Sequence, residues 1–158
     1  MKASARFLRR AALLLTATFL APSHPAGAEE APGERGDLRR PVALGFCGRK
    51  LLCANRGSGS VSLIELDPLR VSSEQKIGGR LEDLESTGNG ILVTDSATGL
   101  LLSLSLAAGR LKQVAALPIG RAPGDISLDS AGKHCAVASP WSRQVTLVNL
   151  EQGRGGDV

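Results

Sequence analysis

The sequence predicts an all-β fold made of three consecutive strand-rich repeats, preceded by an export signal. Three observations support this fold class. The N-terminus has the composition of a signal peptide, a 19-residue pattern recurs three times, and no segment after residue 40 has convincing helical periodicity. The folded part of the chain is therefore expected in residues 41–158.

Residues 1–28 have the three parts of a signal peptide. The basic residues of the first part are Lys2, Arg6, Arg9 and Arg10, and an apolar stretch of 11 residues follows at 11–21. The small residues 26–28 then supply a cleavage pattern before Glu29. Because a membrane-spanning helix needs roughly 20 apolar residues, we expect cleavage and no membrane span in the mature chain.

This signal predicts a periplasmic or secreted protein, and it also accounts for the basic charge. The arginine pair Arg9-Arg10 leaves the twin-arginine route open beside the favoured general secretory route. The chain has 19 Lys and Arg against 15 Asp and Glu, and four of these basic residues but no acidic ones lie in residues 1–28. The mature chain is therefore expected to be neutral, and nucleic acid is not an expected partner.

Residues 29–40 (EEAPGERGDLRR) are charged and contain glycine and proline, which predicts a flexible leader. After the leader, three segments align without gaps at offsets of 40 and 44 residues. They are 48–66 (GRKLLCANRGSGSVSLIEL), 88–106 (GNGILVTDSATGLLLSLSL) and 132–150 (GKHCAVASPWSRQVTLVNL). Each runs from a glycine turn through an apolar strand and a polar loop into a second apolar strand, which is typical of a β-hairpin.

The second strand of the hairpin carries apolar side chains on both faces. In the first repeat Val61 and Leu63 lie on one face, and Ile64 and Leu66 lie on the other. A sheet with one face in water would alternate apolar and polar residues, so this pattern indicates a sheet packed between two neighbouring sheets. Such stacking is the arrangement of propeller blades.

Four strands can be placed in each of the first two repeats and three in the last. The expected strands are 42–46, 51–54, 60–66 and 71–77, then 81–85, 90–94, 100–106 and 111–117, and finally 125–128, 135–138 and 144–150. Residues 151–158 (EQGRGGDV) are polar and glycine-rich and predict a poor fourth strand. The sequence thus predicts a partial β-propeller of about three four-stranded blades, at 41–79, 80–120 and 121–150, with the last blade incomplete and a polar tail.

Short motifs in the repeats resemble those of the YVTN-type β-propeller family. Leu92-Val93-Thr94-Asp95 resembles the Tyr-Val-Thr-Asn core of that repeat, as does Leu52-Cys53-Ala54-Asn55. Residues 61–65 resemble its Val-Ser-Val-Ile-Asp strand and 129–133 its Ser-Pro-Asp-Gly-Lys turn. The chain departs from the family in having no tyrosine and in carrying Pro140-Trp141 in a loop. The resemblance implies an exported bacterial propeller protein, a class sometimes fused to cytochrome c or peroxidase-like modules.

Three blades are fewer than the four to eight that close a propeller. We therefore expect exposed blade faces and an unpaired strand edge at 144–150. The chain is expected to be the N-terminal piece of a longer protein or a truncated reading frame. Self-association into a ring through the open blade faces is the alternative.

The sequence predicts no catalytic residue, no metal site and no cofactor within this chain. Cys53 and Cys135 align with apolar strand positions and are expected as buried free thiols, and the spacing of Cys47 and Cys53 does not favour a disulfide. No C-x-x-C-H motif is present for covalent haem attachment. His134 is the only histidine of the mature chain and lies at a predicted turn, so a multi-ligand metal site is not expected.

The candidate binding residues lie at the blade junctions and in the hairpin loops 55–59, 95–99 and 139–143, which are expected to open on one face. They are Arg80, Asp83, Asp95, Arg121, Asp125, Trp141 and Arg143. Trp141 is a large aromatic residue in one of these loops, and such a residue is a common recognition anchor. The alternative is that the arginines and aspartates bridge adjacent blades and that Trp141 caps the end of a blade.

We therefore expect a non-catalytic binding or scaffolding module for a protein or small-molecule ligand. The alternative is the propeller portion of a periplasmic oxidoreductase, or of a lactonase-like hydrolase, whose catalytic residues lie outside this chain.

Overall fold

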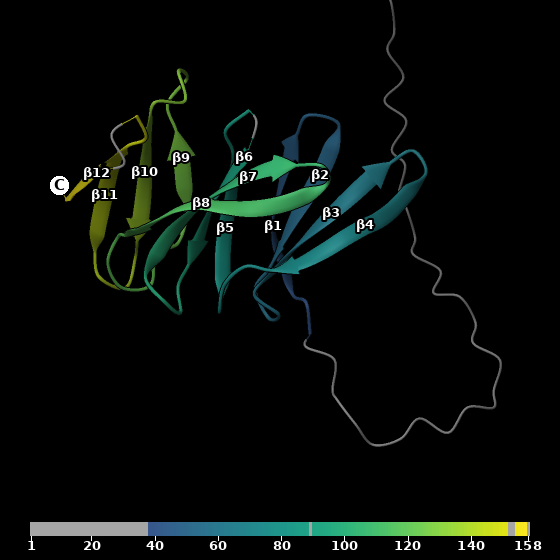
Figure 1. Ribbon diagram of the computed structural model, residues 1–158. Helices are drawn as coiled ribbons and strands as arrows, with labels where there is room; N and C mark the ends of the chain where they lie inside the picture. Colours follow the sequence, from purple (N-terminus) through teal and green to yellow (C-terminus); the bar gives the residue numbers. More distant parts are fainter. Residues whose placement is uncertain (1–37, 89, 152–153, 158) are drawn as a thin grey trace, which may run out of the picture. The chain divides into compact units, whose positions relative to one another are not determined.

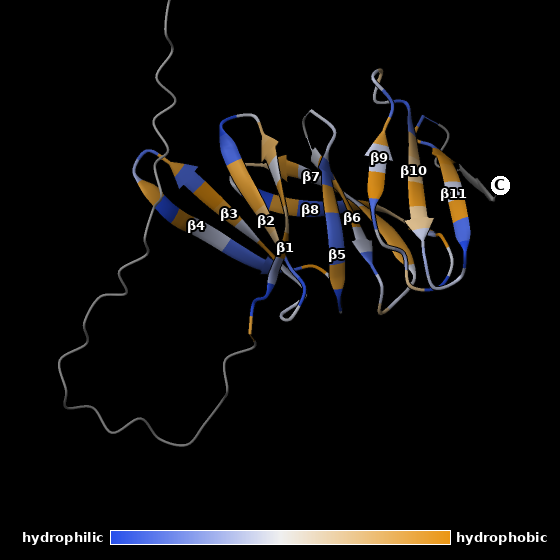
Figure 2. Ribbon diagram, turned by 180° about the vertical axis from the view of Figure 1, so that it is seen from behind, coloured by the Kyte–Doolittle hydropathy of each residue, from blue (hydrophilic) through white to orange (hydrophobic). Residues whose placement is uncertain are grey.

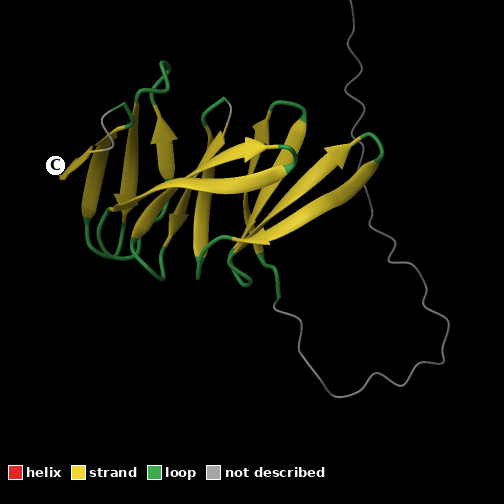
Figure 3. Ribbon diagram, viewed as in Figure 1, coloured by secondary structure: helices red, strands yellow, loops and turns green. Residues whose placement is uncertain are grey.

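The structure is a computed structural model that describes residues 38–88, 90–151 and 154–157, the last four by their backbone alone. All regular secondary structure in these residues is β-strand (Figure 3). No part of the described chain forms a helix of the length and hydrophobicity that a membrane span requires. The predicted signal peptide and residues 29–37 of the predicted leader lie outside the described residues.

The described strands form three four-stranded antiparallel sheets, each in chain order (Figure 1). The first is β1 Pro41–Cys47, β2 Lys50–Asn55, β3 Ser60–Leu66 and β4 Leu69–Lys76. The second is β5 Leu81–Ser86, β6 Gly90–Asp95, β7 Leu100–Ala107 and β8 Arg110–Pro118. The third is β9 Ile126–Leu128, β10 His134–Ser139, β11 Gln144–Asn149 and β12 Arg154–Asp157. The predicted all-β fold of three propeller blades is confirmed.

The third blade corrects one expectation, since residues 151–158 do contribute a fourth strand. β12 pairs antiparallel with β11, with Arg154 opposite Asn149 and Asp157 opposite Thr146. Pairing along a strand edge uses backbone N–H and C=O groups, so a glycine-rich sequence can supply it, and the edge of β11 is not left unpaired. The last blade is still the least complete, because β12 has four residues whereas β4 and β8 have eight and nine.

The first two blades pack face to face through a continuous apolar core. Leu52, Val61 and Leu63 of the first blade are fully buried in the same cluster as Leu84 and Ile91 of the second. The second sheet lies close to Gly45, where a Cβ atom would be 2.6 Å from Leu84 Cδ2. Burial of one such aliphatic side chain stabilises a fold by about 1.5–3 kcal/mol, so this interface is a main source of stability.

The opposite face of the second blade packs against the third. Leu92 and Leu101 belong to a separate buried cluster with Ile126, Cys135 and Val148. All six residues of β6 are buried, because its alternate side chains enter the two interfaces. The predicted burial of both blade faces is therefore confirmed for the middle blade. In the first blade the face opposite the core is open, and Leu66 is exposed.

The three cysteines are buried and free, which confirms the expectation for Cys53 and Cys135; the burial of Cys47 was not predicted. Burial raises the pKa of Cys135 to about 11. Burial, with the nearby Glu74 carboxylate, also raises the pKa of Cys53. The thiols of Cys53 and Cys135 therefore stay protonated near neutral pH and serve as small apolar core groups.

Candidate binding face

Each hairpin loop lies beside the junction that leads into its own blade. The Arg56 amide donates to the carbonyl of Arg40 at 2.9 Å, and the Ser96 amide donates to the carbonyl of Arg80 at 2.9 Å. In the third blade the Ser142 hydroxyl donates to the carbonyl of Arg121 at 3.4 Å. Loops and junctions of the three blades thus gather at the same end of the strands, as the sequence predicts.

A pocket of about 590 Å³ opens at this end and draws residues from all three blades. Its lining consists of Arg56 from the first blade, Arg80, Glu82 and Ser96 from the second, and Ala122, Pro123, Gly124, Asp125, Pro140 and Trp141 from the third. Three of the predicted site residues, Arg80, Asp125 and Trp141, therefore come together here. Trp141 is 88% exposed, so it does not cap a blade.

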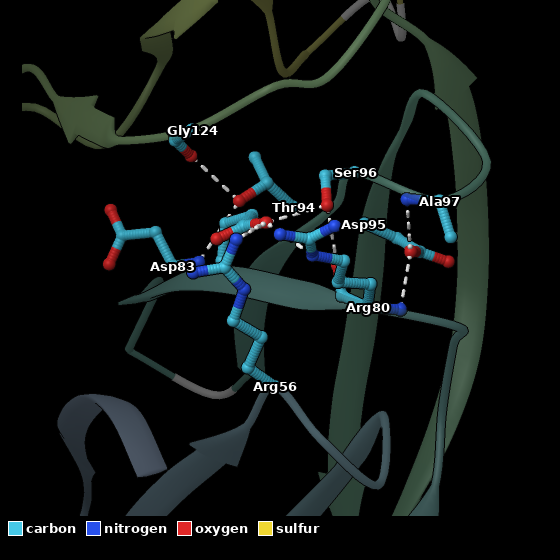
Figure 4. A network of polar contacts seen from close by, with 9 residues as sticks. Arg56, Arg80, Asp83, Thr94, Asp95, Ser96, Ala97 and Gly124 are labelled. Atoms are coloured by element: carbon cyan, nitrogen blue, oxygen red, sulfur yellow. Dashed lines mark hydrogen bonds and ion pairs between the residues drawn. The ribbon is translucent and has the colours of Figure 1, made fainter. Parts of the chain in front are cut away.

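The Glu82 carboxylate connects the first two blades within this pocket. Its Oε1 atom lies 3.1 Å from Arg56 Nη2 and 3.3 Å from Arg80 Nε, and it accepts a hydrogen bond from Ser96 Oγ at 2.6 Å. Figure 4 shows the guanidinium groups of Arg56 and Arg80 converging from neighbouring blades. Two cations thus share one carboxylate.

A second pocket of about 580 Å³ adjoins the first and shares Arg56 and Arg80 with it. Its other lining residues are Arg40, Val42, Gly57 and Gly79. Three arginines line this pocket and no carboxylate does. This second pocket is therefore locally positive, although the mature chain is expected to be neutral.

Asp95 has a structural role at the entrance to the second blade. Its carboxylate accepts hydrogen bonds from the amides of Gly79, Arg80 and Ala97 at 2.9–3.0 Å and from the Thr98 hydroxyl at 2.9 Å. Burial favours the neutral acid, but these hydrogen bonds outweigh it and hold the pKa of Asp95 below its ordinary value. Asp95 is almost fully buried, so it fixes the junction and does not face a ligand.

Asp83 joins the second blade to the third. Its Oδ2 atom accepts the amide of Ile126 at 2.7 Å, and its Oδ1 atom accepts the amide of Leu84 at 2.8 Å. Beside it, the Thr94 hydroxyl donates to the carbonyl of Gly124 at 2.7 Å (Figure 4). For Asp83 and Asp95 the bridging interpretation therefore holds, because their carboxylate oxygens bind backbone amides.

The remaining predicted residues lie away from the main pocket. Arg121 lines a smaller pocket of about 290 Å³ with the second-blade loop residues 96–99. Arg143 is exposed and has a backbone φ of 56°, in the left-handed region. His134 pairs with Asp129 across its turn, with 3.0 Å between Nδ1 and Oδ2. Among the described residues no group of three or more metal-ligating side chains was found.

The sequence does not predict Arg56 or Glu82. In the gap-free alignment Arg56 takes the place of Ser96 and Pro140. Glu82 lies just before the aligned segment of the second repeat, and strand pairing makes Val42 its counterpart in the first blade. No residue type recurs at either position, so the repeat pattern does not mark Arg56 or Glu82 as a candidate site residue. Only the side-by-side placement of the first two blades brings their side chains together.

No family model matches the sequence, and no curated protein matches it. Solved structures do match. Hydrazine synthase of Kuenenia stuttgartiensis superposes with a TM-score of 0.69 and 15% identity over 83% of this chain and 38% of its own. The Swd1 β-propeller domain of Myceliophteria thermophila superposes with a TM-score of 0.60 and 15% identity, over 73% of this chain and 41% of its own. A periplasmic gluconolactonase of Pseudomonas aeruginosa superposes with a TM-score of 0.63 and 19% identity, over 75% of this chain and 38% of its own.

These likenesses establish a class of fold. The chain has the β-propeller fold, and it spans about two fifths of the length of the structures that it matches. At 15–19% identity the similarity is evidence for the fold alone.

Proposed function

We propose that the chain is a non-catalytic binding module of an exported propeller protein, and that its loop face holds a small anionic ligand. The observation that carries the proposal is the pair of guanidinium groups, Arg56 and Arg80, that share the single carboxylate of Glu82. The two pockets together are lined by three arginines, Arg40, Arg56 and Arg80, and by two carboxylates, Glu82 and Asp125, so one positive charge has no carboxylate counterpart within the lining. A carboxylate or phosphate group of a ligand would supply it.

The residue types suit such a ligand. Guanidinium groups bind carboxylates and phosphates through two parallel hydrogen bonds, which gives direction as well as charge. Trp141 lies across the same pocket and offers a flat apolar surface to the remainder of the ligand. The lining contains neither histidine nor cysteine, and Glu82 is held by three donors, which favours binding over catalysis.

The proposal places this face in the periplasm or outside the cell, on the strength of the predicted signal peptide at residues 1–28. It also requires additional blades, because a ring of the propeller type needs at least four. The sequence interpretation in which this chain is the N-terminal part of a longer propeller protein would supply such blades. The loop-face site itself needs only the three blades described.

Titration with small anions is expected to change the fluorescence of Trp141, the single tryptophan of the chain. We expect a saturable change with phosphate or an aromatic dicarboxylate, because both groups match the two guanidinium groups. The affinity should fall about tenfold or more in an Arg56→Ala, Arg80→Ala double variant, since a charged hydrogen bond contributes about 1.5–3 kcal/mol. Added salt should weaken binding.

The matched control is Arg110→Ala, which removes an exposed arginine from the start of β8 and leaves the loop face intact. Its affinity should equal that of the unaltered chain. If no anion altered the fluorescence, or if the double variant bound as tightly as the control, the proposed site would be wrong.

A further inference from the structure

The two pockets of the loop face lie at successive blade junctions. The second pocket is lined by residues of the first blade and of the junction into the second. The main pocket continues from Arg56 and Arg80 to Trp141 in the hairpin loop of the third blade. A ligand larger than a single anionic group can therefore extend from one pocket into the other.

Arg40 and Arg80 occupy equivalent positions in the first two blades. Each directly precedes the first strand of its blade, and its carbonyl oxygen accepts the amide of the facing hairpin loop at 2.9 Å. In Figure 2 the chain has hydrophilic colour where it enters β1 and where it enters β5. Strand pairing makes Ile126 of the third blade the counterpart of Leu84, which places Ala122 where the other blades have arginine. The series of junction arginines therefore stops at the third blade.

Positive charge is concentrated at the first two blades. Glu82 Oε1 lies 3.1 Å from Arg56 Nη2 and 3.3 Å from Arg80 Nε, so this carboxylate offsets one of the two charges. Arg40 lines the second pocket with the same two arginines, and none of the ion pairs found among the described residues involves it. Two positive charges thus remain at the junction of the first two blades, one on Arg40 and one shared by Arg56 and Arg80.

The third-blade end of the main pocket has a different character. Its lining includes Trp141, which is 88% exposed, and the prolines Pro123 and Pro140. Its charged residue is Asp125, which is exposed and whose carboxylate repels an anion. The tryptophan ring instead offers a flat apolar contact. A bound ligand should therefore direct its anionic end toward the first two blades and its apolar end toward Trp141.

We propose that the ligand of the loop face is a dianion with an apolar ring, and that Arg40 binds its second anionic group. The first group binds at Arg56 and Arg80, the second reaches Arg40 in the second pocket, and the ring contacts Trp141. This inference rests on the function proposed above. It adds Arg40 as the residue that distinguishes a dianion from a monoanion.

The test compares the affinities of benzoate, isophthalate and terephthalate for the purified chain by isothermal titration calorimetry. Isophthalate should bind about ten times as tightly as benzoate, or more, because its second carboxylate gains a charge-assisted hydrogen bond to Arg40. Terephthalate has the same charge, but its carboxylates lie at opposite ends of the ring. Its affinity should therefore stay within about threefold of that of benzoate, since one carboxylate would face the third-blade end.

The variant Arg40→Asn removes the guanidinium group and retains a residue that adopts the left-handed backbone of position 40, where φ is 50°. In this variant the affinity for isophthalate should fall to within about threefold of that for benzoate. Arg110→Asn is the matched control, because it removes the same charge at the start of β8 and should keep the full preference for isophthalate. Far-ultraviolet circular dichroism of both variants verifies that the blades remain folded.

The possible results separate this inference from the proposed function. Equal affinities for benzoate and isophthalate, or a preference for isophthalate that persists in Arg40→Asn, would overturn the role of Arg40. Benzoate binding that depends on Arg56 and Arg80 would still support the proposed function in that case. An equal loss of the preference in Arg110→Asn would show a general charge effect and would also overturn the role of Arg40. If none of the three probes bound, both proposals would be wrong.

Discussion

Replacing Asp95 by alanine is expected to lower the free energy of unfolding by about 3–4 kcal/mol, because it removes the acceptor of four hydrogen bonds at once. The amides of Gly79, Arg80 and Ala97 would be left without this partner at the junction between the first two blades. Urea unfolding followed by far-ultraviolet circular dichroism measures the loss. Trp141 fluorescence is a poor probe of unfolding, since that side chain is already exposed in the folded state.

Two further variants test whether the lost hydrogen bonds cause the destabilisation of Asp95→Ala. Asp95→Asn keeps the shape but turns part of the acceptor into a donor that faces amide N–H groups, so it should recover only part of the lost stability. Asp125→Ala removes an exposed aspartate near the same face and should change stability by less than about 0.5 kcal/mol. Equal stabilities of the Asp95→Ala and Asp125→Ala chains would contradict the structural role of Asp95.

The stability that Asp95 contributes should also depend on pH in one direction. The folded-state pKa of Asp95 is depressed, because hydrogen bonds to its carboxylate outweigh the opposing effect of burial. The unfolded chain therefore binds a proton more readily than the folded one at this residue. Its contribution is present in full above the ordinary aspartate pKa of about 3.9 and is lost as the pH falls through the lower folded value. The difference in unfolding free energy between the unaltered chain and Asp95→Ala should shrink over that acidic range.

Replacing Gly99 by valine is expected to destabilise the chain by about 3 kcal/mol or more, the second large effect. A φ of +72° is strained for any residue with a β-carbon and most of all for a β-branched one. The new Cβ atom would also lie 2.5 Å from the carbonyl oxygen of Gly120, which belongs to the backbone and cannot simply rotate away. Thermal and urea unfolding measure the change.

The chain contains its own control for Gly99, because Arg143 occupies the equivalent position of the third repeat. Arg143→Ala keeps a β-carbon at the same positive φ, so its effect should stay within about 0.5 kcal/mol. Arg143→Gly should stabilise the chain by up to about 1 kcal/mol by relieving the left-handed strain. Equal losses in Gly99→Val and Arg143→Ala would show that the nearby Gly120 carbonyl does not cause the glycine requirement at residue 99.

Most of the strand framework could be predicted from sequence, because stacked blades impose the same pattern three times. The apolar run and the polar loop before it predict β3 with its observed bounds, residues 60–66. β12 could not be predicted in this way, since Arg154–Asp157 joins the third blade by backbone pairing and has no apolar pattern to mark it.

The binding face was less predictable, for two physical reasons. Arg56 lies in the first repeat and Glu82 in the second, and neither residue type is found at the equivalent position of another repeat. Only the packing of one blade on another brings the two side chains together. Asp83 and Asp95 have the charge expected of a ligand site, yet their oxygens are already bound to backbone amides. Residue type alone does not distinguish a carboxylate that binds backbone amides at a blade junction from one that is free to bind a ligand.

The central claim is that each blade is held by apolar contact with its neighbours, so the middle blade is the most protected. Hydrogen exchange of the chain, measured at a concentration at which light scattering shows a single copy, tests this blade by blade. The account predicts that amides of β6 and β7, whose sheet is covered on both faces, exchange more slowly than those of β1, β2, β10 and β11. Exchange at β6 and β7 as fast as at β1 and β11 would contradict the stacked-blade fold.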